Sequence, residues 1–125
     1  KGCEVGECGA CNVLIDGEAY NSCIYLAVWA EGKHIRTLEG LLGPNSELSD
    51  IQQAFVDEAA IQCGFCTPGF ILTAVEILES GKEYTDDELR KLLSGHLCRC
   101  TGYENILRAV KKTMYKRLGK PMPEA

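Results

Sequence analysis

Side chains that carry out catalytic chemistry are scarce in this sequence of 125 residues. It has two histidines, His34 and His96, and neither stands in a pattern with other catalytic residue types. No serine or cysteine forms the nucleophile-and-base arrangement of a covalent catalyst. No glycine-rich phosphate loop leads into a helix with a lysine. These absences predict that the chain has no arrangement of catalytic residues for substrate chemistry of its own.

Long apolar runs and an overall basic charge are also missing. No stretch approaches the ~20 apolar residues that a transmembrane helix needs. The net charge of −5, the pI near 5.0 and the lack of a basic patch with aromatic residues argue against nucleic-acid binding. Residues 101–125 are the exception, with six Lys and Arg against Glu104 and Glu124. This basic end is either a docking surface for an acidic partner or, the reading we prefer, a solvated helix face.

What the sequence does have is eight cysteines, which fall into two groups of four. The first group is Cys3, Cys8, Cys11 and Cys23, and the second is Cys63, Cys66, Cys98 and Cys100. The first group has the C-x4-C-x2-C spacing and distant fourth cysteine of a plant-type [2Fe–2S] ferredoxin. The second group combines C-x2-C with C-x-C. Each group supplies the four thiolates that one [2Fe–2S] cluster needs, so the pattern predicts an electron carrier with two clusters.

The spacing alone leaves three other uses of the cysteines open. Four disulfides are typical of short secreted chains with poor cores, whereas this chain is 46% hydrophobic. Two structural zinc sites usually take paired C-x2-C knuckles, which the uneven first group lacks. Cys63 and Cys66 resemble a thioredoxin-like pair, but that leaves Cys98 and Cys100 unexplained. A free-standing two-cluster ferredoxin and a zinc-stabilised interaction module are therefore the alternative functions.

Glycines alternate with the first three cysteines, at Gly2, Gly6 and Gly9. Glycine permits positive φ and close backbone approach, so this loop can form a concave nest with its N–H groups pointing inward. An iron–sulfur cluster with four thiolates is negatively charged, and amide donors directed at the sulfurs stabilise that charge. The loop sequence therefore favours a cluster over an ordinary turn.

Helix starts adjoin the second group of cysteines. Thr67-Pro68 follows Cys66 and predicts an N-cap with proline at the first helical position, in a helix that ends at Gly81. The residues 101–104 read as a capping box, and the helix that follows carries apolar residues at helical spacing as far as Leu118. Two helix N-termini, which favour negative charge, are thus expected to converge on the second cluster.

The remaining patterns predict an α+β fold class. Capping boxes at Ser49 and Thr85 start two further helices, so residues 43–125 are expected to form an all-α four-helix domain with a basic last helix. Residues 1–42 contain a hairpin around Asp16-Gly17 and another strand within 34–38. This first unit is too small to enclose a cluster alone, and we expect that its first strands are missing.

Three segments together carry a specific resemblance: KGCEVGECGACNVLIDG…NSC, IQCGFCTPGFIL and LSGHLCRCTGY. They resemble the iron–sulfur small subunit of the xanthine dehydrogenase family of molybdenum hydroxylases, most of all the bacterial xanthine (purine) dehydrogenase subunits. The resemblance implies a β-grasp [2Fe–2S] ferredoxin domain followed by the four-helix [2Fe–2S] domain. It implies a cytoplasmic hetero-oligomer with a large molybdopterin-binding subunit, which determines the substrate, and an FAD-binding subunit. Electrons would run from molybdenum through both clusters to FAD.

The resemblance also implies roles for individual residues. The first cysteine group would hold the cluster toward FAD, and the second group the cluster toward molybdenum. Gln62 and Cys100 would approach the pterin. The sequence departs from the family pattern at Asn12, where threonine is common, and at His96, where asparagine is usual. Neither change removes a ligand. One hypothesis for His96 is a hydrogen bond near Cys98 that makes the reduction potential pH-dependent; we expect instead a loop histidine with no such role.

Overall fold

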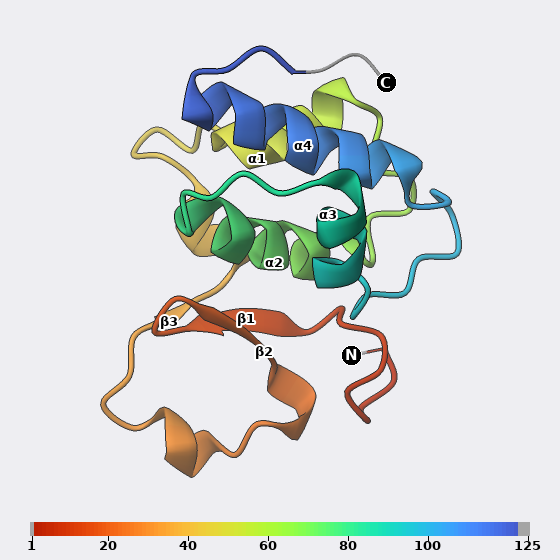
Figure 1. Cartoon of the computed structure of the whole chain (residues 1–125). Helices are drawn as coiled ribbons and strands as arrows, with labels where there is room; N and C mark the ends of the chain where they lie inside the picture. Colours follow the sequence, from red (N-terminus) through yellow and green to blue (C-terminus); the bar gives the residue numbers. More distant parts are fainter. Residues whose placement is uncertain (1, 123–125) are drawn as a thin grey trace.

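A three-stranded antiparallel sheet forms the base of the fold in the computed structural model, which describes residues 2–122 (Figure 1). The central strand β1 (Asn12–Ile15) lies between β2 (Glu18–Asn21) and β3 (Ile35–Arg36). Asp16 and Gly17 have φ values of 50° and 86°, as the two-residue turn of a tight hairpin requires. The predicted hairpin is confirmed, whereas the third strand is shorter than the predicted 34–38.

Short 3₁₀ turns replace regular strands in the rest of the N-terminal part. They are η1 (Ser22–Ile24), η2 (Ala27–Ala30) and η3 (Leu38–Leu41). Val28 and Trp29 remain 69% and 54% exposed. The apolar character of this stretch therefore does not reflect burial within the described part of the chain.

Four helices follow the sheet, as predicted: α1 (Asp50–Asp57), α2 (Thr67–Glu79), α3 (Asp86–Leu92) and α4 (Glu104–Leu118). Both expected capping boxes are present. The Ser49 amide donates to the Gln52 side chain at 2.9 Å, and the Glu88 amide donates to the Thr85 hydroxyl at 3.2 Å. These bonds satisfy amides that a helix start would otherwise leave unpaired, which is why these two starts are readable from sequence. The α+β class is confirmed.

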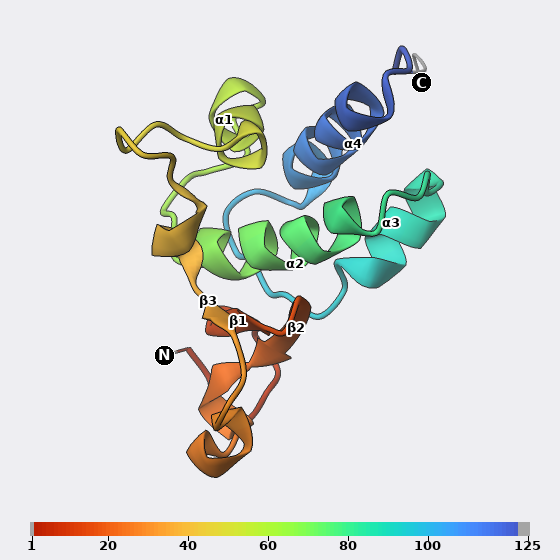
Figure 2. The same cartoon turned by 90° about the vertical axis from the view of Figure 1, so that its left-hand side faces the viewer.

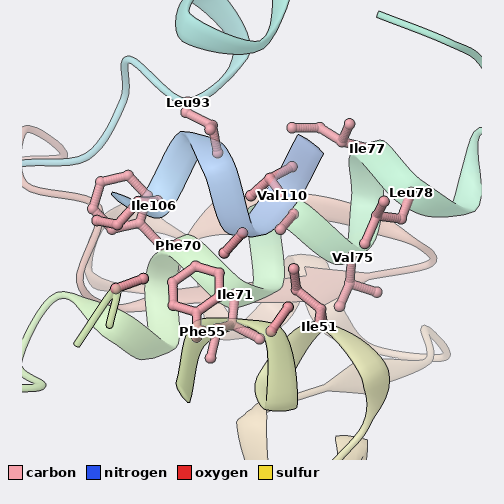
Figure 3. Packing of buried hydrophobic residues seen from close by; sticks show 14 of the residues in the cluster. Ile51, Phe55, Phe70, Ile71, Val75, Ile77, Leu78, Leu93, Ile106 and Val110 are labelled. Atoms are coloured by element: carbon pink, nitrogen blue, oxygen red, sulfur yellow. The ribbon is translucent and has the colours of Figure 1, made fainter. Parts of the chain in front are cut away.

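Helix α2 is the centre of the fold. It packs on the sheet on one side and against α1 and α4 on the other (Figure 2). Its side chains meet those of the other helices in one apolar cluster (Figure 3). Leu14 of β1, 1% exposed, belongs to the same cluster, and Arg36 of β3 pairs with Glu79 of α2 at 2.8 Å. The sheet and the helices therefore share a continuous core that fixes the loops at their edges.

Two predicted helix starts differ from the structure. Cys66, not Thr67, is the N-cap of α2, so the cysteine itself stands at the helix N-terminus. The capping box predicted at Thr101 is wrong, because α4 begins after Tyr103, whose φ is 74°. Thr101 instead directs its hydroxyl to the Cys98 sulfur at 3.2 Å. The same hydroxyl accepts from the Tyr103 amide at 3.2 Å, so Thr101 links the cysteine motif to the start of α4.

The basic residues near the C-terminal end mostly pair with carboxylates on other elements. The pairs are Lys111–Asp86, Lys112–Glu58, Arg117–Asp50 and Lys120–Glu83, at 2.6–3.1 Å. They join α4 and the residues after it to α1, to α3 and to the segment before α3. At least one side chain of each pair is more than a third exposed, and such pairs contribute about 1 kcal/mol or less each. No helix within residues 2–122 combines the length and the apolar character needed to span a bilayer.

Candidate metal centres

The loop from Cys3 to Cys8 forms a nest around a sulfur atom. The amides of Val5, Glu7 and Cys8 donate to Cys3 Sγ at 3.5, 3.2 and 3.3 Å. Gly6, with a φ of 81°, helps to turn the chain so that these amides point inward. The amide of Val5, with those of Cys8 and Glu7, lowers the pKa of the Cys3 thiol to about 6. This is the inward-facing arrangement that the glycines predicted, and it favours a thiolate.

The four thiols of the first group lie in two pairs. The Cys3 and Cys8 side chains interact with each other, and so do those of Cys11 and Cys23. The Cys23 amide also donates to Cys11 Sγ at 3.4 Å. Burial tends to raise the pKa of Cys11, but the Cys23 amide and other donors outweigh it and lower that pKa. Burial and the hydrogen bond with Cys11 raise the pKa of Cys23. The hairpin β1–β2 thus brings the distant fourth cysteine to the loop.

The second group surrounds a hollow of about 430 Å³. It is lined by the four cysteines Cys63, Cys66, Cys98 and Cys100, and by Phe65, Leu97, Arg99 and Tyr103. Here too the thiols are paired across the two motifs, Cys66 with Cys98 and Cys63 with Cys100. The two segments that supply them are far apart in sequence. The fold brings them together because one precedes α2 and the other precedes α4.

The pKa values of the thiols in the second group are shifted in different directions. Burial and the hydrogen bond with Cys98 raise the pKa of Cys66 to about 12. Burial opposes ionisation of Cys98 as well, but the Thr101 hydroxyl and amide lower its pKa to about 7. The hydrogen bond with Cys63 raises the pKa of Cys100. A metal binds thiolates and displaces these protons, and the Thr101 donors favour the charged form it needs.

The donor set fits [2Fe–2S] clusters. All eight cysteines are free thiols. Within residues 2–122, no three Cys, His, Asp or Glu side chains converge as they would around a single ion. A [2Fe–2S] core divides four thiolates between two irons, so it needs thiols in pairs, and paired thiols are what each group provides. Gln62, the predicted pterin contact, lies exposed beside Cys63, and Cys100 is exposed as well.

The two cysteine loops touch each other. The Leu97 amide donates to the Cys8 carbonyl at 2.9 Å, which joins the residue before Cys98 to a cysteine of the first group. His96 beside it lies in a loop, as expected, but its side chain is buried, at 4% exposed. Burial lowers the pKa of His96 to about 4, partly offset by the Gly9 backbone, and the imidazole is therefore neutral near pH 7. No local pattern predicts its hydrogen-bond partner Thr73, which lies on α2.

Comparison with known proteins agrees with this geometry. Residues 37–111 match the family model of the [2Fe-2S] binding domain. The xanthine dehydrogenase iron-sulfur-binding subunit of Escherichia coli O157:H7 is 54% identical over 112 residues, which are 88% of this chain and 70% of that protein. The chain belongs to the iron–sulfur subunits of xanthine dehydrogenase-type oxidoreductases. The predicted family, its [2Fe–2S] cofactor and its electron-transfer role are confirmed.

Two further members of this family differ in the substrate that their names state. The nicotine 6-hydroxylase small subunit of Paenarthrobacter nicotinovorans is 50% identical over 109 residues, 87% of this chain and 65% of that protein. The crystal structure of quinoline 2-oxidoreductase from Pseudomonas putida 86 has a TM-score of 0.87 and 45% identity, over 97% of this chain and 76% of that one. The chain is thus similarly identical to relatives named for xanthine, nicotine and quinoline. Sequence identity in this subunit therefore does not indicate which substrate the enzyme oxidises.

Proposed function

We propose that this chain carries electrons from a molybdopterin centre on a large partner subunit, through two [2Fe–2S] clusters, to FAD on a second partner. In this proposal the cysteines at 63, 66, 98 and 100 hold the cluster nearer molybdenum, and those at 3, 8, 11 and 23 hold the cluster nearer FAD. The chain contributes no catalytic residue. It acts in a cytoplasmic hetero-oligomer, where the reducing environment suits eight free thiols.

The observation that carries the proposal is the contact between the two cysteine loops. Each loop gathers four thiols, and the bond from the Leu97 amide to the Cys8 carbonyl connects them. From Cys8 Sγ to Cys98 Sγ the path runs along covalent bonds interrupted by this one hydrogen bond. A protein that merely stored iron or used a metal for stability would not need its two sites linked in this way.

The hydrogen-bond donors around each site stabilise negative charge on the cysteine sulfurs. A bound [2Fe–2S] cluster supplies one-electron redox chemistry. The Val5, Glu7 and Cys8 amides face Cys3, and the N-terminus of α2 begins at Cys66. Such donors favour negative charge at the sulfurs and set the reduction potential of each site.

The surface around the second cysteine group combines exposed apolar side chains with polar groups, as a binding interface does. Phe65 and Leu97 on its rim are 58% and 57% exposed, while Cys63, Cys100 and Gln62 offer polar groups beside them. An apolar rim with a few polar groups is typical of a protein or cofactor contact. We assign this face to the molybdopterin subunit, with Gln62 or Cys100 within hydrogen-bond reach of the pterin.

The domain division is part of the same proposal. Residues 1–42 would be the C-terminal part of a β-grasp ferredoxin domain. Residues 43–125 would be the four-helix [2Fe–2S] domain. Support comes from the distribution of elements, because every described strand precedes residue 42 and every described α-helix follows it. The match of the family model from residue 37 fits the second unit.

The test is the order of reduction in the complex assembled with its molybdopterin and flavin subunits. After rapid mixing with the oxidisable substrate, Cys8→Ser should still allow molybdenum and the second cluster to be reduced, while electrons fail to reach FAD. Cys98→Ser should stop electron transfer one step earlier, between molybdenum and the second cluster. Freeze-quenched EPR spectra and flavin absorbance distinguish the two. Reduction of the first cluster in the Cys98→Ser complex at the wild-type rate would reverse the proposed order.

A further inference from the structure

The His96 side chain lies at the junction of the two cysteine loops and is held from both sides. Its ring stacks on Phe70 of α2, with centroids 4.6 Å apart and planes inclined by 33°. Its Nε2 lies 2.7 Å from Thr73 Oγ1 and 3.4 Å from Asn12 Nδ2. Asn12 Nδ2 also donates to Thr73 Oγ1 at 2.9 Å. Because Asn12 follows Cys11, this polar group ties the first cysteine loop to α2 and to the second loop.

The junction leaves no room for adjustment on the side of the first loop. Gly9 has a φ of 73°, and a Cβ there would overlap the His96 ring and the Gly95 carbonyl. A Cβ on Gly69 of α2 would likewise overlap the Gly9 carbonyl. The Gly9 backbone therefore lies directly against the α2 backbone on one side and against the His96 ring on the other. Packing this close transmits a shift of one group to its neighbours, because dense interiors compress little.

Leu97 follows His96 in the chain, and its amide makes the bond to the Cys8 carbonyl. The backbone at 96 and 97 is thus anchored by the imidazole on one side and by the contact between the loops on the other. We propose that His96 is the positioning residue that sets the separation of the two clusters, by holding the Leu97 amide on the Cys8 carbonyl. This inference rests on the proposed function, since it requires a cluster at each cysteine group.

Substitutions at His96 separate its hydrogen bonds from its volume. His96→Phe keeps an aromatic ring against Phe70 but leaves the Thr73 hydroxyl and the Asn12 amide without it as a partner, which weakens the junction. His96→Gln places an amide group at about the reach of Nε2 and is expected to restore these contacts. His34→Gln is the matched control, because His34 is exposed and directly precedes β3.

The experiment measures the low-temperature EPR spectrum of the fully reduced, cluster-loaded chain. Two paramagnetic clusters held close together split each other's signals, and the splitting depends on their separation and on the path that joins them. The wild-type, His96→Gln and His34→Gln chains should show the same splitting. His96→Phe should retain both signals and lose the splitting. Thr73→Val leaves the His96 ring stacked on Phe70 but removes the hydroxyl, and it should weaken the splitting. If His96→Phe assembles poorly, Thr73→Val provides the test of the proposal.

The possible outcomes separate this inference from the proposed function. If the wild-type chain lacks two cluster signals, the proposed function itself fails. If both signals are present and the splitting is unchanged in His96→Phe or, where that variant assembles poorly, in Thr73→Val, His96 is not a positioning residue. A lower melting temperature with unchanged splitting has the same meaning, because it reports a structural role alone. Loss of splitting in His96→Gln as large as in His96→Phe also overturns the inference.

Discussion

Gly9→Ala tests the close approach of the two cysteine loops most sharply. The new methyl group would overlap the His96 ring and the Gly95 carbonyl, and the φ of 73° at Gly9 disfavours any residue with a Cβ. The left-handed backbone costs about 1 kcal/mol for alanine. Overpacking adds about 1–3 kcal/mol, because the neighbours are backbone and a buried ring that cannot move freely. We therefore expect Gly9→Ala to reduce the free energy of unfolding by about 2–4 kcal/mol.

Gly17→Ala is the matched control for this prediction. Gly17 has a similar φ of 86°, and nothing lies within 4 Å of a Cβ there. It should lose about 1 kcal/mol, the backbone term alone. Urea unfolding of the cluster-loaded chains, followed by circular dichroism and visible absorption together, gives both values when the two transitions coincide. Equal destabilisation by the two substitutions would refute the proposed packing at Gly9.

Three further predictions concern the clusters, the core and the dependence on pH. Cys8→Ser and Cys98→Ser should each remove a different one of the two EPR signals, and loss of the same signal in both would show that the cysteines are wrongly divided. Phe55→Ala, at a side chain that is 0% exposed, should cost about 3–5 kcal/mol in urea unfolding, whereas Val56→Ala on the exposed side of α1 should stay within about 0.5 kcal/mol. The hydrogen bond from Arg117 holds the pKa of Asp50 below its usual value, so Asp50 stabilises the fold above pH ~4 and this contribution is lost as the pH falls through the folded pKa. Asp50→Asn should therefore be less stable than wild type at neutral pH, and this difference should shrink below pH ~4 in thermal melts; a constant difference would exclude the pair as its cause.

The features that sequence predicts correctly are those with short-range causes. Asp16-Gly17 forms the hairpin because both residues accept positive φ, and Ser49 and Thr85 start helices because each meets a side chain three residues later. The nest around Cys3 is also local, since its donors lie within five residues. The spacing of the cysteines reflects the ligand number of the cluster, which is chemistry rather than packing.

Features that sequence reasoning missed depend on contacts between distant segments. Thr101 fits the sequence pattern of a capping box, yet α4 begins only at Glu104, and the Thr101 hydroxyl donates to Cys98 Sγ. His96 reads as a loop residue, but Phe70 and Thr73, more than twenty positions earlier, bury it. The contact of Leu97 with Cys8 joins segments that are far apart in the sequence. No local pattern encodes these approaches, since they follow from how α2 packs on the sheet.

The central claim is that the chain holds two [2Fe–2S] clusters, one in each cysteine group. Metal and sulfide analysis of the purified chain, combined with EPR after dithionite reduction, tests it most directly. We predict about four iron atoms and as many sulfides per chain, with two distinct EPR signals. Stoichiometric zinc in a chain without visible absorption, or a single EPR signal with half the iron, would contradict the account.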